Sequence, residues 1–144
     1  MLTETTKSNV PRVLLADDHQ IILDTESQIL ASEFDVVGTV RNGAAIVPAA
    51  AELDPDVITL DITMPEVDGF EVARRLKASG SRAKIVFLTV HEDPDFVREA
   101  LNVGALGYVI KATMASDLLR SLHAVLKGQP FISPSLRFNI TSRS

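Results

Sequence analysis

The sequence predicts an α/β fold, an open doubly wound parallel sheet of five strands with helices on both faces. Three observations support this prediction. Short apolar runs rich in β-branched residues alternate with longer amphipathic segments along the chain. The runs lack polar and apolar alternation, which is typical of strands buried on both faces of a parallel sheet. Five strand and helix repeats favour right-handed crossovers, which place helices on both sides of the sheet.

The predicted strands are short buried runs of four residues or fewer. A helix that crosses a bilayer needs about 20 apolar residues, so we expect neither a membrane span nor a membrane partner. In chain order the runs are Val13–Ala16, Val36–Val37, Val57–Leu60, Ile85–Leu88 and Tyr108–Ile110.

The segments between the strands carry helix start and stop signals. Asp93 offers an N-cap, Pro94 fits the first turn that follows, and Gly104 provides a stop. A further helix is predicted from Phe70 to Ser79, and the last helix of the chain stops at Gly128.

One segment conflicts with a regular helix. The sequence between Asn42 and Leu53 is rich in Ala, which favours helix, but it contains Pro48. Proline lacks the N–H that an interior helical hydrogen bond needs, so it fits only in the first turn. We predict that this second helix starts late or is distorted.

Length and composition indicate one globular domain in the cytoplasm. A chain of 144 residues suits a single hydrophobic core. The net charge of -5 argues against direct binding of nucleic acid by this chain, because such binding relies on clustered Lys and Arg. The chain has no cysteine, which excludes disulfides and thiolate metal sites, and its polar start has no apolar signal core.

Polar residues follow four of the predicted strands at their carboxyl ends. They are Asp17 with Asp18 after the first strand, Asp61 after the third, Thr89 after the fourth and Lys111 after the fifth. Each alone could be structural, as a helix cap, a turn or a strand end. In an open parallel sheet, however, ligands bind at this edge, where the strand order reverses. Three carboxylates there would repel one another unless a cation or a basic side chain is present.

This set of side chains predicts a magnesium site that handles phosphate. Mg²⁺ prefers octahedral oxygen coordination and is typically held by one or two carboxylates plus phosphate oxygens. Phosphoryl transfer needs in-line positioning and neutralisation of the phosphate charge. Asp61, Lys111 and Thr89 supply a carboxylate nucleophile, an amine and a hydroxyl for that purpose.

In four ordered motifs the sequence resembles the receiver family of two-component response regulators. The resemblance covers about residues 11–129 and implies a flavodoxin-like, CheY-like sheet with strand order 2-1-3-4-5. The motifs are Leu14–His19, Asp61–Gly69, Phe87–Thr89 and Gly104–Lys111.

The resemblance also implies roles for the residues that carry it. Asp61 would be the phospho-acceptor, and Asp18 and Asp61 would contact Mg²⁺ directly. Asp17 would act on the ion largely through water. The backbone carbonyl of Thr63 would complete the protein ligands.

A switch and its partners are implied in the same way. Thr89 and Lys111 would hold the phosphoryl oxygens, and Tyr108 would turn inward as the threonine hydroxyl moves toward the phosphate. The surface of the fourth helix, fifth strand and fifth helix would then change. The expected partners are a sensor histidine kinase and, after phosphorylation, a second copy of the chain.

The polar, unpatterned start of the chain predicts a flexible arm (1–10). The resemblance adds a receiver domain (11–129) and a linker-like tail (130–144). The tail is similar to the linker of the LuxR-type, or NarL-type, subfamily, in which a DNA-reading helix-turn-helix domain follows. Only eight residues come after Leu136, too few for such a reader. We therefore expect transcription to be controlled through a domain that this chain lacks.

Several positions near the site vary within the family. Val90 is bulkier than the small residue often found there and would crowd the acceptor. Thr63 and His91 occupy positions that influence the lifetime of the phosphoryl group. Ala112 follows Lys111 where many relatives have Pro after a cis peptide bond, so the isomer of this bond stays open.

Two other functions stay open beside the signalling receiver, which is not expected to be an enzyme acting on added substrates. A phosphatase of the haloacid-dehalogenase type also uses an Asp, Mg²⁺, a hydroxyl and a Lys. Its nucleophile, however, follows the first strand, and it has a second Asp where this chain has Thr63. A degenerate receiver would act as an unphosphorylated interaction module. The histidines His19, His91 and His123 are interpreted as surface or rim residues.

Overall fold

Six parallel strands carry the fold in the computed structural model, which describes residues 10–136. They lie in the order β2-β1-β3-β4-β5-β6, which confirms the predicted fold class and the order 2-1-3-4-5 of the first five. The strands are β1 (Arg12–Ala16), β2 (Asp35–Val40), β3 (Val57–Leu60), β4 (Lys84–Thr89), β5 (Gly107–Ile110) and β6 (Phe131–Ile132).

The sheet has one strand more than the five predicted. β6 pairs in parallel with β5, and the next residue, Ser133, donates its backbone N–H to the Tyr108 carbonyl at 2.9 Å. Ser133 Oγ also accepts the Ile110 N–H and donates to Asp117 Oδ2. A run of two apolar residues after a helix stop is too short to indicate a strand. The predicted end of the receiver domain at residue 129 stays a prediction. Residues 1–9 and 137–144, which hold most of the predicted arm and the end of the predicted tail, lie outside the described part of the chain.

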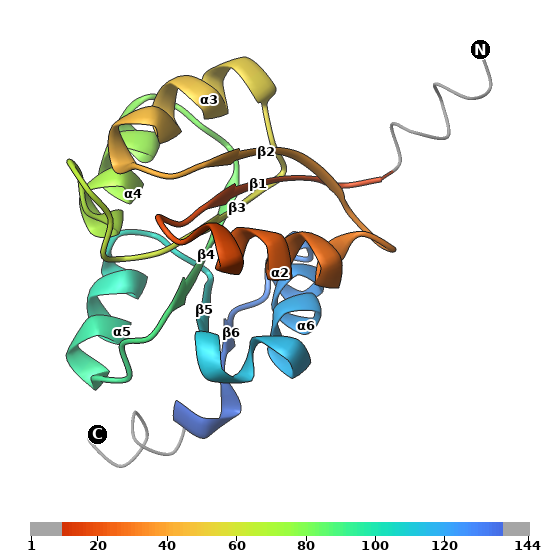
Figure 1. Cartoon of the computed structure of the whole chain (residues 1–144). Helices are drawn as coiled ribbons and strands as arrows, with labels where there is room; N and C mark the ends of the chain where they lie inside the picture. The colour runs from red at the N-terminus through yellow and green to blue at the C-terminus, as the bar shows by residue number, and fades with distance from the viewer. Residues whose placement is uncertain (1–9, 137–144) are drawn as a thin grey trace.

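Two layers of helices cover the sheet (Figure 1). The helices α3, α4 and α5 pack on one face, and α2 and α6 pack on the other. Neighbouring residues of β1 alternate between these cores, since Leu14 faces the first and Leu15 the second. The helices are α2 (Gln20–Leu30), α3 (Ile46–Leu53), α4 (Gly69–Ala78), α5 (Pro94–Asn102) and α6 (Met114–Leu126).

Helices begin where the start signals predict. The Asp93 side chain accepts the Asp95 N–H at the start of α5, with Pro94 as the first helical residue. The segment with Pro48 also behaves as expected, because a short 3-10 helix (Gly43–Ala45) precedes α3. Pro48 is then the third residue of α3, where its missing N–H breaks no helical hydrogen bond.

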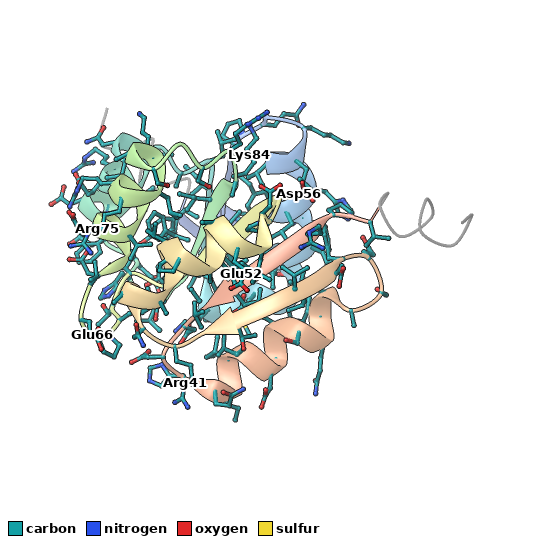
Figure 2. All side chains as sticks on the ribbon, turned by 90° about the horizontal axis from the view of Figure 1, so that it is seen from above. Arg41, Glu52, Asp56, Glu66, Arg75 and Lys84 are labelled. Atoms are coloured by element: carbon teal, nitrogen blue, oxygen red, sulfur yellow. The ribbon has the colours of Figure 1, made fainter. Side chains whose placement is uncertain are left out.

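The carboxyl ends of the strands meet at one edge of the sheet. Arg41 and Glu66, in the loops that follow β2 and β3, lie at the opposite end of the molecule from Asp56 and Lys84 (Figure 2). Asp56 precedes β3, and Lys84 begins β4. Between residues 10 and 136, no helix combines the length and the apolar character needed to cross a membrane.

Gly69 allows α4 to start directly against the loop that follows β3. Its N–H donates to the Ile62 carbonyl at 2.7 Å, and a Cβ at this position would lie 2.2 Å from the Asp61 carbonyl oxygen. The backbone must shift to relieve such a contact. We expect Gly69→Ala to lower the free energy of unfolding by about 3 kcal/mol, as overpacking does.

Urea denaturation measures this loss, and Gly80→Ala is a suitable control. Gly80 has φ of +85°, but no atom lies within 4 Å of the place that a Cβ would take, so alanine there adds backbone strain alone. That strain costs about 1 to 2 kcal/mol. An equal or larger loss in the Gly80 variant would contradict the steric argument for Gly69.

Candidate functional site

The structure gathers the predicted acidic residues where the strand order reverses, between β1 and β3. Asp17 and Asp18 follow β1, and Asp61 follows β3. One side-chain oxygen from each of the three lies within 4.8 Å of the others. Thr89 ends β4, the strand between those that carry Asp61 and Lys111, and its side chain is buried.

Lys111 joins two of these carboxylates. Its Nζ lies 2.7 Å from Asp17 Oδ2 and 3.0 Å from Asp61 Oδ2. Burial works to lower the pKa of Lys111, but the close contacts with Asp17 and Asp61 outweigh it and raise this pKa. The ammonium group therefore stays charged and offsets the repulsion between two buried carboxylates.

Asp61 is held by contacts to both of its carboxylate oxygens. Oδ1 accepts the Ile62 N–H at 2.8 Å, and Oδ2 accepts a hydrogen bond from Lys111. Burial raises the pKa of Asp61, Lys111 opposes this, and the negative charge of Asp17 adds to it. Asp61 is thus fixed at both oxygens in a buried position that disfavours its charged form.

The oxygens of Asp17 and Asp18 fit a divalent cation. Asp17 is 1% exposed, and its Oδ2 is paired with the Lys111 ammonium at 2.7 Å. Asp18 Oδ1 is buried without a hydrogen bond among the described residues, and His19 Nδ1 lies 3.0 Å from it. A buried oxygen without such a partner is costly, and a cation that prefers oxygen ligands would satisfy it. Together with Asp61, these carboxylates offer the kind of oxygen donors that Mg²⁺ prefers.

His91 connects the predicted switch residues. The buried Tyr108 donates its hydroxyl to the His91 carbonyl at 2.8 Å, and the His91 N–H donates to Thr89 Oγ1 at 3.4 Å. The His91 ring lies 2.9 Å from Thr63 Oγ1 through Nε2. Burial raises the pKa of Tyr108. The loop after β4 therefore contacts both Tyr108 and the loop that carries Thr63.

The structure also describes Val90 and the bond before Ala112, two positions that vary in the family. Val90 follows Thr89 and is 64% exposed. The described backbone, residues 10–136, contains no cis peptide bond, so the bond between Lys111 and Ala112 is trans.

Sequence reasoning missed His19, which is interpreted as a surface residue. Its Nδ1 lies 3.0 Å from Asp18 Oδ1 and 3.3 Å from Asp17 Oδ1. His19 is the N-cap residue of α2 and donates its backbone N–H to Asp17 Oδ1 at 2.9 Å. Its position directly after two acidic residues at a strand end is the signal that could have identified it.

Glu26 was missed as well. It lies on the buried face of α2 with Leu23 and Leu30, and its Oε1 accepts a hydrogen bond from Thr59 Oγ1 at 2.7 Å. Burial raises the pKa of Glu26 to about 8, helped by the charge of Asp17 and opposed by the Thr59 hydrogen bond. Its spacing of three and four residues from these leucines is the signal in the sequence.

Comparisons with known proteins agree with this geometry. The profile of the response regulator receiver domain family matches residues 13–123. The transcriptional regulatory protein DegU of Brevibacillus brevis is 33% identical over 141 residues, an alignment that covers 96% of this chain and 60% of DegU. The chain thus spans less than two thirds of the length of this relative.

Solved structures are similar over most of the chain. The crystal structure of a LuxR-family two-component response regulator from Aurantimonas sp. SI85-9A1 has a TM-score of 0.89 and 26% identity, and covers 93% of this chain and 97% of that one. The isolated REC domain of RcsB from Salmonella enterica serovar Typhimurium, with the phosphomimetic BeF3-, has a TM-score of 0.81 and 28% identity. That match covers 88% of this chain and 95% of the RcsB chain.

Proposed function

This chain belongs to the response regulator receiver domain family, and from that premise we propose that Asp61 accepts a phosphoryl group from a sensor histidine kinase. The observation that carries the proposal is the setting of Asp61. Asp61 is 4% exposed, and its carboxylate is fixed by Ile62 and Lys111 and lies beside the carboxylates of Asp17 and Asp18.

The transfer forms one bond and breaks another. A carboxylate oxygen of Asp61 bonds to phosphorus while the bond between phosphorus and the kinase histidine nitrogen breaks, and the imidazole keeps the electron pair. Lys111 offsets negative charge on the phosphoryl oxygens, and the Thr89 hydroxyl donates a hydrogen bond to one of them.

Mg²⁺ is the proposed cofactor. Asp17, Asp18, Asp61 and the backbone carbonyl of Thr63 would hold it, with Asp17 acting largely through water. When bound, the ion supplies positive charge that neutralises the phosphate oxygens.

A signal would pass from the acceptor to the surface formed by α5, β5 and α6. The phosphoryl group adds roughly -1.5 to -2 of charge, which attracts Thr89 and Lys111. The hydrogen bonds of His91 with Thr89 and Tyr108 support a coupled movement of the two switch residues. The surface that they underlie would then bind differently to its partners.

The proposed partners follow the family. We assign the protein to the cytoplasm, with a histidine kinase as donor and a homodimer forming on phosphorylation. RcsB, which is 27% identical to this chain, has been solved as dimers bound to DNA. In this protein, transcription would be controlled through a DNA-binding domain outside the chain, since the net charge of -5 does not favour direct DNA contact.

Incubation with acetyl phosphate and Mg²⁺, followed by intact mass measurement, tests the proposal. We expect one phosphoryl group per chain, and no labelling when EDTA removes the metal. Continued release of phosphate over many turnovers would favour a phosphatase of the haloacid-dehalogenase type instead. A wild-type chain that neither takes the label nor responds to beryllofluoride would support the unphosphorylated module.

Lys111→Ala should separate phosphorylation from the switch. The variant retains the acceptor carboxylate, so labelling by acetyl phosphate continues, but no ammonium group draws β5 toward the phosphate. We expect the chemical-shift changes that beryllofluoride causes in α5 and α6 to be mostly lost. Lys127→Ala, which removes an exposed lysine after α6, is the matched control. Shift changes of wild-type size in the Lys111 variant would contradict this role.

A further inference from the structure

We propose that the His19 imidazole is a ligand of the divalent cation at the acidic site, and that it shifts the preference of the site toward first-row transition-metal ions such as Mn²⁺ and Co²⁺. The inference rests on the proposed function, because Asp17 and Asp18 serve both. It adds a nitrogen donor to a set of ligands that otherwise contains only oxygen.

The distances around the ring fit a shared ion. An ion with bonds of about 2.1 Å in octahedral geometry separates neighbouring ligand atoms by about 3.0 Å. His19 Nδ1 lies 3.0 Å from Asp18 Oδ1 and 3.3 Å from Asp17 Oδ1. His19 Nδ1 and Asp18 Oδ1 therefore have the spacing of two neighbouring ligands of one ion, and one ligand atom from each of Asp17, Asp18, His19 and Asp61 lies within 4.8 Å of the others.

The surrounding groups leave Asp18 Oδ1 available. It is buried, and no residue among those described (10–136) forms a hydrogen bond with it. Asp17 is 1% exposed and is paired through Oδ2 with Lys111. The His19 backbone N–H donates to Asp17 Oδ1, which holds the ring beside both carboxylates. The His19 side chain is 65% exposed, and its Nδ1 faces the carboxylates of Asp17 and Asp18.

The donor type determines the expected preference among ions. Imidazole nitrogen suits first-row transition metals, whereas Mg²⁺ takes oxygen ligands and keeps several waters. A nitrogen ligand should therefore strengthen binding of Mn²⁺ and Co²⁺ much more than binding of Mg²⁺.

The chain provides controls, because it has three histidines. His91 lies near the site, but its Nε2 contacts Thr63 Oγ1 at 2.9 Å and its ring stacks on Phe96. His123 contacts Glu33 between α6 and the end of α2. His91→Gln thus removes a nearby imidazole but keeps the His19 imidazole, which faces Asp17 and Asp18.

Pulsed electron paramagnetic resonance of the Mn²⁺-loaded protein tests the contact directly, since a bound imidazole gives nitrogen modulation of the electron spin echo. We expect this modulation in wild type and in His91→Gln, and its loss in His19→Ala. Titration of the free Mn²⁺ signal should show an increase in Kd of about tenfold in His19→Ala. Competition with Mg²⁺ should show a much smaller change for that ion.

The outcomes separate this inference from the proposed function. Tight Mn²⁺ binding by wild type without nitrogen modulation would show that His19 is only a hydrogen-bond partner of the carboxylates, and would overturn the inference. Equal losses of Mn²⁺ and Mg²⁺ affinity in His19→Ala would overturn the claimed preference. Labelling of wild type by acetyl phosphate with Mg²⁺ is scored separately, and its failure would overturn the proposed function.

Discussion

The Asp61→Asn variant is expected to take up no phosphoryl group from acetyl phosphate in the presence of Mg²⁺. Asparagine keeps the size of the side chain and can still accept the Ile62 N–H, but its amide is not a nucleophile. Intact mass measurement of the treated protein should therefore show only the unmodified chain. The loss should be complete, because no other carboxylate in the site has the same contacts.

The fold should survive this change. Burial raises the pKa of Asp61, so the fold disfavours its charged form, and a neutral amide removes the repulsion with Asp17. We expect a Tm equal to that of wild type or higher. Asp24→Asn, which changes an exposed aspartate of α2, should label fully. A phosphoryl group found on the Asp61→Asn variant would contradict the proposal that Asp61 is the phospho-acceptor.

Glu26→Gln is expected to remove most of the pH dependence of stability between about pH 5 and pH 8. Burial raises the folded-state pKa of Glu26 to about 8 from an ordinary value of 4.5. The folded protein therefore binds a proton that the unfolded chain has released. Stability from this group is fully present below pH 4.5 and is lost as the pH rises through 8.

The slope of this loss is about 1 kcal/mol per pH unit within the window. Glutamine keeps the shape of the side chain and a carbonyl that can accept from Thr59, but it does not ionise. Urea unfolding at pH 5.5 and pH 8.5 should show wild type losing a few kcal/mol relative to the variant. The charged neighbours Asp17, Asp61 and Lys111 are the same in both proteins, so the two proteins differ only in the side chain at position 26.

Glu52→Gln provides the control for this comparison. Glu52 lies exposed on α3, away from the buried face of α2 (Figure 2). Its replacement should leave the pH profile of wild type unchanged. Parallel profiles for wild type and the Glu26 variant would show that the carboxyl group is not buried in its neutral form.

The sequence predicted the buried strands and the residues at their carboxyl ends, because each of these patterns has a single physical explanation. Runs such as Val57–Leu60 are apolar throughout because a central parallel strand is covered on both faces. Once the strands are assigned, the positions of Asp17, Asp61 and Lys111 at one edge follow, since parallel strands end together.

The rest depends on contacts that no local pattern reveals. Phe131–Ile132 forms a strand by pairing with the edge of β5, and the next residue, Ser133, donates its hydroxyl to Asp117. Glu26 contradicts the expectation that a helix glutamate faces water, and the partner that permits its burial, Thr59, is 33 residues away. The approach of His19 to two carboxylates depends on the angle at which the chain enters α2.

Because β6 pairs with β5, the segment that leads the chain away from α6 is itself a strand of the sheet. Ile132 stands opposite Tyr108, and Leu136 is buried in the core shared with that ring. The chain is therefore held against β5 as far as Leu136, the last residue that the structure describes. A displacement of β5 would therefore also move the chain at Leu136 and change the direction in which it leaves the sheet.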